Sequence, residues 1–288
     1  MGWLAAAVAC SVAIAALFER AERRGVDRLA MLAVNYVVAG AVAAVLLPAP
    51  VRAAGLPPAP LVGLGSLAGA LFLAGFFLLS ASIRAVGMGL ATGVMRLSVV
   101  VPVLASWAVW GERPSALQLV GLALAGAAFF LLAKQDRASE RPGDGLVRGT
   151  ALLALLFVVG GLVDTSLKAF GAEFGAEYPE PLFLLVVFGV AALLGGALVL
   201  ARGWRTRRWP RAEVLVWGAL IGLANYGSAA FLLRALAVLP GPVAFPANNV
   251  AIVVGAALVG WAFFGERPTR RHLFGLAVAA LALALLWG

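Results

Sequence analysis

Cysteine, histidine and charged side chains are all scarce in this sequence. The one cysteine, Cys10, excludes an intramolecular disulfide, and the one histidine, His272, excludes a metal site built from several histidines. Charged residues form only 12% of the 288 residues, whereas hydrophobic residues form 63%, and the mean hydropathy is +1.02. This composition excludes an ordinary soluble globule and predicts a protein that crosses the membrane many times. We expect no metal ion and no cofactor.

Apolar segments long enough to cross a bilayer recur along the whole chain. A transmembrane helix needs about 20 predominantly apolar residues. The first apolar run starts at Gly2, with no basic residue before it and no cleavage pattern after it, so we expect a retained span rather than a signal peptide. The sequence predicts an all-α membrane protein with ten transmembrane helices, at residues 2–18, 29–47, 60–80, 88–110, 116–133, 149–170, 181–201, 213–233, 242–264 and 270–287.

One stretch of the chain occurs twice. Residues 107–132 return 154 positions later as residues 261–286. Aligned without a gap, residues 77–133 and 231–287 are identical at 22 of 57 positions, including the whole polar corner Gly-Glu-Arg-Pro. A composition rich in alanine and leucine inflates chance matches, but it does not align a polar corner. The sequence therefore contains an internal repeat.

The repeat and the charges together predict the topology. The longest polar segment, residues 134–148, separates a first repeat at 1–133 from a second at 149–288, with five spans in each. Because five is odd, the second repeat crosses the membrane in the opposite sense, which is the inverted-repeat design of many secondary transporters. Seventeen of the 22 lysines and arginines lie in loops after odd-numbered spans. The positive-inside rule therefore predicts that these loops are cytoplasmic and that both termini are outside.

The repeated corner resembles a known family. Gly-Glu-Arg-Pro after the fourth span, followed by Leu119, Gly121 and Leu122, and its copy after the ninth span resemble the EamA-type members of the drug/metabolite transporter superfamily. The resemblance extends over nearly the whole chain. It implies ten helices in two inverted five-helix repeats around a central cavity, working by alternating access. The resemblance also implies that both termini lie in the cytoplasm, whereas the arginine bias of this sequence predicts that they lie outside.

The corner itself favours a structural interpretation. Its glycine suits a helix end and its proline suits the start of the next helix. Ser115 and Gln118 then form a possible capping box. The alternative is a gating contact between a nearby arginine and Glu112, or Glu266 in the second copy.

Arg96 is a candidate binding residue. It lies eight residues into the fourth span, about 12 Å below the membrane surface, where an arginine costs about 2.5 to 3.5 kcal/mol. Snorkelling to the cytoplasmic face is one interpretation. The other is a cavity-lining cation that pairs with a substrate carboxylate or phosphate. Pro102 in the same span frees the carbonyl of Ser98 and predicts an interrupted helix, which transporter sites favour.

Asp164 is the only acid within the body of a span and the one candidate for proton coupling. Lys168 lies four residues later on the same helix face, so an internal ion pair is the alternative. A contact between Asp164 and Arg96 across the cavity is a further alternative, although their depths differ by roughly 9 Å.

Amide and phenol side chains recur in three spans. Interhelical hydrogen bonding is their commoner use in membranes. Substrate contact is the alternative, and it is favoured for the two asparagines after Pro246, because the prolines there predict a broken helix start. These candidates are Asn35, Tyr36, Asn225, Tyr226, Asn248 and Asn249.

These features favour a secondary transporter for a small organic solute, an anionic or zwitterionic metabolite with amino acids among the candidates. A multidrug or cation exporter of the same superfamily is the alternative, but an acid is missing from the centre of span one. An intramembrane enzyme is disfavoured because the sequence has no acid pair, nucleophile beside a base or ligand cluster. We expect a multi-pass protein of a bacterial inner membrane, acting as monomer or homodimer, whose partners are solute and lipid and not nucleic acid.

Overall fold

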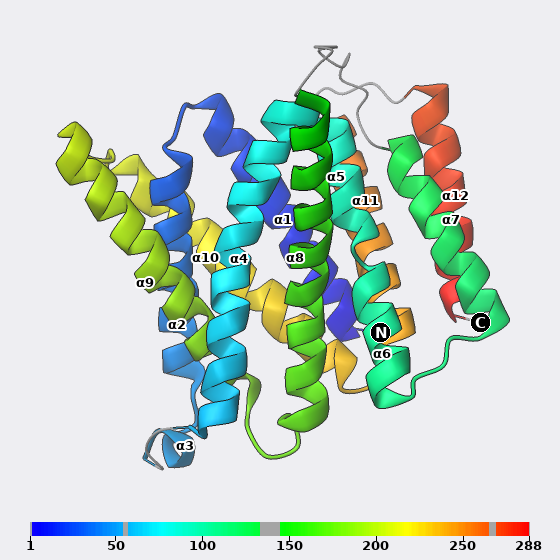
Figure 1. Ribbon diagram of the computed structural model, residues 1–288, viewed down its shortest axis with the longest axis horizontal. Helices are drawn as coiled ribbons and strands as arrows, with labels where there is room; N and C mark the ends of the chain where they lie inside the picture. The colour runs from blue at the N-terminus through cyan, green and yellow to red at the C-terminus, as the bar shows by residue number, and fades with distance from the viewer. Residues whose placement is uncertain (1, 54–56, 133–144, 265–268, 288) are drawn as a thin grey trace. The chain divides into compact units, whose positions relative to one another are not determined.

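The computed structural model describes residues 2–53, 57–132, 145–264 and 269–287, and every regular element in these ranges is an α-helix (Figure 1). Most of the predicted linker and the second polar corner, with Glu266, lie outside the described residues. The helices are α1 (Gly2–Arg23), α2 (Arg28–Leu46), α3 (Ala49–Ala53), α4 (Ala59–Val86), α5 (Met88–Leu97), α6 (Val100–Trp110), α7 (Ala116–Leu132), α8 (Gly145–Glu173), α9 (Glu180–Thr206), α10 (Glu213–Leu236), α11 (Gly241–Phe264) and α12 (Arg270–Trp287).

The ten predicted spans are all present as apolar helices. In the described chain, nine helical segments are long and apolar enough to cross a membrane, with α5 and α6 counted together, and α7 is a shorter apolar helix. The all-α membrane fold is therefore confirmed. Several helices run past their predicted ends, as α4 does to Val86 and α9 to Thr206. Hydropathy marks the part of a helix that suits lipid, whereas backbone hydrogen bonding continues beyond it.

The fourth span consists of two helices. α5 ends at Leu97 and α6 begins at Val100. Pro102 has no N–H to donate to the carbonyl of Ser98, and that carbonyl instead accepts the N–H of Val101 at 2.9 Å. The interruption predicted from the proline is confirmed.

The interruption predicted in the ninth span is wrong. α11 is continuous from Gly241 to Phe264 with Pro246 inside it. The carbonyl of Pro240 accepts the N–H of Ala244 at 2.9 Å, so the helical ladder begins at once. A proline this close to a helix start removes one hydrogen bond and leaves the later ladder intact. The prolines therefore start the helix and do not break it.

The first polar corner is a helix joint, as predicted. Gly111 ends α6 in the left-handed conformation, with φ at 70°. The N–H of Ser115 donates to Gln118 Oε1 at 2.9 Å, and the N–H of Gln118 donates to Ser115 Oγ at 3.2 Å. This reciprocal pair is a capping box, which satisfies two donors at the start of α7.

The chain forms two compact units. Unit 1 comprises residues 1–73 and 169–237, and unit 2 comprises residues 74–168 and 238–288. In unit 1, α2 packs against α9 and α10, and α1 packs against α10; in unit 2, α7 packs against α12, and α11 against α6, α7 and α12 (Figure 1). Each unit thus joins helices from both halves of the sequence. Several of these pairs, such as α7 with α12, are counterparts in the internal repeat, while the repeat boundaries themselves stay a prediction.

Small residues allow close helix packing within unit 1. A Cβ atom added to Gly69 on α4 would lie 2.4 Å from the carbonyl oxygen of Val187 on α9. One added to Gly222 on α10 would lie 2.6 Å from the carbonyl oxygen of Asn35 on α2. Glycine at these positions brings backbones together, which is how membrane helices gain packing energy without a hydrophobic driving force.

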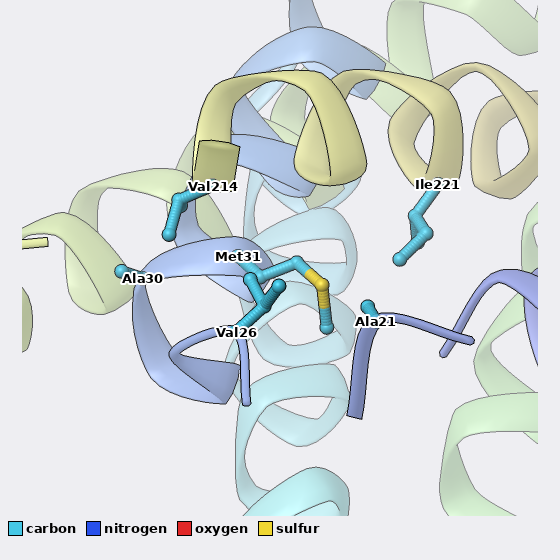
Figure 2. Close-up of a cluster of buried hydrophobic side chains, with 6 residues drawn as sticks. All are labelled: Ala21, Val26, Ala30, Met31, Val214 and Ile221. Carbon is cyan, nitrogen blue, oxygen red and sulfur yellow. The ribbon is translucent and has the colours of Figure 1, made fainter. Parts of the chain in front are cut away.

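A buried apolar cluster holds one end of unit 1 together (Figure 2). Met31 of α2 lies at its centre and is fully buried. Partners come from α1, from the turn after it and from α10, so the cluster joins three helices through one short connection. The six side chains are Ala21, Val26, Ala30, Met31, Val214 and Ile221.

Candidate functional site

Arg96 lies in the last turn of α5, directly before the break between α5 and α6. Its side chain is half-buried in unit 2, and its Nη1 donates to Asn249 Oδ1 on α11 at 3.0 Å. Snorkelling would carry the guanidinium toward the membrane surface. The bond to another transmembrane helix instead fixes it against α11, and this supports the interpretation of Arg96 as an internal cation.

Two adjacent asparagines on α11 differ in their hydrogen bonding. Asn249 is buried, and its Nδ2 donates to the carbonyl of Phe245 one turn earlier at 3.2 Å. Both ends of its amide are thereby used, so the side chain holds Arg96 in a fixed orientation. Asn248 is also buried, but its Oδ1 has no hydrogen-bond partner among the described residues. A buried acceptor without a partner costs about 1 to 3 kcal/mol, and a bound donor group would remove that cost.

Asp164 of α8 lies on the helix face that packs against the break. Gly160, one turn earlier, is so close to α5 that an added Cβ would lie 2.8 Å from Ser98 Oγ. Gly161 lies even closer to Val101, because an added Cβ would lie 2.4 Å from the Cβ of that residue. Residues four apart share a helix face, so Asp164 also points toward the break. Its carboxyl group lies within electrostatic range of the guanidinium of Arg96.

Lys168 does not pair with Asp164 in the described chain. Its Nζ donates to Glu112 Oε1 at 2.5 Å, and Nζ lies 6.0 Å from the centroid of the Trp110 ring. The other carboxylate oxygen of Glu112 accepts the N–H of Gly241, the first residue of α11, at 2.8 Å. Glu112 therefore links the end of α6, the end of α8 and the start of α11. The alternative interpretation of the corner was a contact of Glu112 with an arginine, but the partner is a lysine.

The remaining sequence candidates lie in unit 1. Asn225 Nδ2 on α10 donates to Asn35 Oδ1 on α2 at 3.1 Å, which is the interhelical bond expected of membrane asparagines. Tyr36 is buried and stacks on Phe188, with ring centroids 6.3 Å apart. Tyr226 is buried, and its hydroxyl has no partner among the described residues. A substrate contact for this set stays a prediction.

The comparisons with known proteins relate the chain to a transporter family. Residues 1–134 match the model of the EamA-like transporter family. The N-terminal part of the chain is therefore similar to that family. An uncharacterized protein of Haemophilus influenzae is 24% identical over 294 residues, which cover 98% of this chain and 96% of that protein. A solved crystal structure has a TM-score of 0.76 at 16% identity and covers 98% of this chain and 94% of its own. That likeness shows a shared fold, and the expected resemblance to the EamA-type transporters is confirmed.

The chain also has ion pairs that could not be predicted from its sequence. In unit 1, Arg234 Nε donates to Glu180 Oε1 at 2.6 Å, and its guanidinium carbon lies 5.1 Å from the centroid of the Trp3 ring. Asp27, the N-cap of α2, pairs with Arg202 of α9. Each pair joins helix ends on one predicted side of the membrane. Listing the acids and bases of each side would have suggested these pairs, but it would not have selected the partners.

No group of three or more histidine, cysteine, aspartate or glutamate side chains that could hold a metal ion occurs in the described part of the chain. Arg96 itself can recognise a ligand by charge and hydrogen bonding. An arginine presents five N–H donors in a planar fork that matches a carboxylate or phosphate.

Proposed function

We propose that this EamA-like transporter carries a small anionic or zwitterionic organic solute, whose acidic group binds to Arg96. The observation that carries the proposal is the bond from Arg96 to Asn249, which holds a half-buried cation at a helix break inside unit 2. A guanidinium in such a place forms strong paired bonds with a carboxylate or phosphate. Asn249 orients the guanidinium of Arg96, and the other N–H groups of that guanidinium stay available to the solute.

The surroundings of Arg96 also suit a positively charged group on the same solute. Asn248 precedes Asn249 on α11, and its Oδ1, which has no partner among the described residues, can accept a hydrogen bond from an ammonium N–H. Asp164 places a carboxyl group near the guanidinium, and this group can act as a counter-charge to an ammonium. A solute with an acid at one end and an amine at the other would satisfy both features, which supports a zwitterion.

Transport into vesicles tests this proposal. Purified protein in proteoliposomes is expected to exchange a labelled organic acid or amino acid, and other anionic and zwitterionic solutes are expected to compete with it. Lipophilic cations are expected to compete poorly, because Arg96 repels them. Exchange of lipophilic cations alone would instead support the multidrug or cation exporter.

Asp164 is the proposed proton-coupling residue. Its carboxyl group can bind a proton that weakens its interaction with Arg96, so protonation would change the charge that the solute meets. Asp164→Asn is expected to remove the dependence of uptake on an imposed pH gradient while exchange without a gradient continues. An equal response to the gradient in wild type and variant would exclude Asp164 from coupling.

The proposed orientation has both termini outside the cytoplasm, as the arginine bias predicts. A reporter enzyme active only in the periplasm, fused after Gly288, is expected to be active in a bacterial host. Activity only from a matched cytoplasmic reporter would reverse the orientation. Location in a bacterial inner membrane is part of the same proposal.

A further inference from the structure

The end of α9 and the turn that follows it form a strongly basic segment. We call residues 202–211 the basic turn. Five of these ten residues are arginines, and no acidic residue occurs between Glu180 and Glu213. Lysine is absent from the segment, so all its positive charge is carried by guanidinium groups.

Only part of this charge is neutralised. Arg202 pairs with Asp27, and Arg211 lies 3.9 Å from Glu213. Arg205, Arg207 and Arg208 are exposed and have no acidic partner in the described part of the chain. Three guanidinium groups within four residues are therefore available to a ligand.

The basic turn has a defined backbone. Arg207 caps α9 in the left-handed conformation, with φ at 55°. Thr206 Oγ1 donates to the carbonyl of Arg202 at 2.8 Å and accepts the N–H of Arg208 at 3.4 Å. The Trp209 ring folds back onto the helix, since a Cβ atom added to Gly203 would lie 2.8 Å from it. These contacts hold the backbone that carries the arginines in a defined conformation.

Two tryptophans flank the free arginines. Trp204 is 70% exposed and Trp209 is 55% exposed. Exposed tryptophans at the ends of membrane helices lie at the level of the lipid headgroups. The arginines between them therefore lie at the depth of the lipid phosphates, where the planar guanidinium binds phosphate oxygens in pairs.

We propose that the basic turn binds the headgroups of anionic phospholipids. Its positive charge would also serve orientation by the positive-inside rule, but that role needs no preference between lipids and no ordered turn. The defined backbone, the paired tryptophans and the exclusive use of arginine support recognition of the phosphate. The net negative charge of the lipid then sets the preference over zwitterionic phospholipids.

Lipid retention by the purified protein tests this proposal. The protein in detergent is incubated with equal amounts of phosphatidylglycerol and phosphatidylcholine, and bound lipid is measured by native mass spectrometry. Wild type is expected to retain phosphatidylglycerol in preference. The variant Arg205→Gln/Arg207→Gln/Arg208→Gln is expected to lose about a hundredfold of that affinity, since each juxtamembrane cation contributes about fivefold.

A control variant with the same loss of charge distinguishes lipid binding at the basic turn from an effect of the protein's net charge. Arg20, Arg84 and Arg270 are exposed and lie in other loops of the same predicted side, so their triple change to glutamine is expected to keep the preference. If the first variant does not fold, Arg208→Gln alone is expected to lose about fivefold. Inorganic phosphate and glycerol phosphate at lipid concentrations are expected not to displace phosphatidylglycerol. Equal retention of the two lipids by wild type, or equal loss in both triple variants, would overturn the proposal.

Discussion

Replacing Arg96 with alanine is expected to abolish solute transport and to leave a folded protein in the membrane. Removing one partner of a buried charged pair costs about 2 to 5 kcal/mol, which is about 30-fold or more in affinity. The protein itself loses the bond from Arg96 to Asn249, and it no longer has to hold a cation inside a span, which is costly. Initial rates of uptake into proteoliposomes, at matched protein incorporation, measure the effect.

Two further variants make this result specific. Arg84 is exposed and bonded to Ser80 on its own helix at 2.8 Å, so Arg84→Ala is expected to transport like wild type. Arg96→Lys keeps the charge but not the planar fork, and it is expected to transport weakly with a raised KM. Normal uptake by Arg96→Ala would reduce Arg96 to a structural residue.

Replacing Glu112 with glutamine is expected to destabilise the protein by about 3 kcal/mol, because it leaves the ammonium of Lys168 buried without its counter-charge. The side chain of Lys168 is only 7% exposed, whereas that of Glu112 is 26% exposed. Lys168→Met is therefore expected to cost less, about 1 kcal/mol. In that variant the carboxylate still meets water, the N–H of Gly241 and the positive end of α11. Thermal unfolding in detergent measures both effects.

The double variant completes this comparison. Glu112→Gln/Lys168→Met removes both charges together, and its stability is expected to match that of Lys168→Met alone, so the second change rescues the first. A larger cost for Lys168→Met than for Glu112→Gln, or additive costs in the double variant, would contradict the arrangement of this pair.

Local sequence signals predicted the helices and their joints well. Gly111 and the pair Ser115 and Gln118 fixed the corner, and Pro102 marked the break after α5. These signals act within a few residues, because capping and proline geometry depend on neighbouring backbone groups. Pro246 misled the same reasoning, since its effect depends on its distance from the helix start.

Contacts between helices that are distant in the chain could not be predicted from the sequence. Arg96 and Asn249 are 153 residues apart, and Glu112 and Lys168 are 56 residues apart. Whether such side chains meet depends on the rotation and tilt of each helix, which packing sets and composition does not. The sequence nevertheless identified Arg96, Asp164 and Asn249 as residues of interest, because charge and amide groups are costly inside a membrane.

The central claim is that Arg96 binds the acidic group of the solute. Its most direct test is a thermal-stabilisation screen of wild type and Arg96→Ala with amino acids, nucleosides and organic anions. At least one anionic or zwitterionic solute is expected to raise the unfolding temperature of wild type and to leave that of the variant unchanged. Equal stabilisation of both proteins by every active solute, or stabilisation of wild type by cations alone, would contradict it.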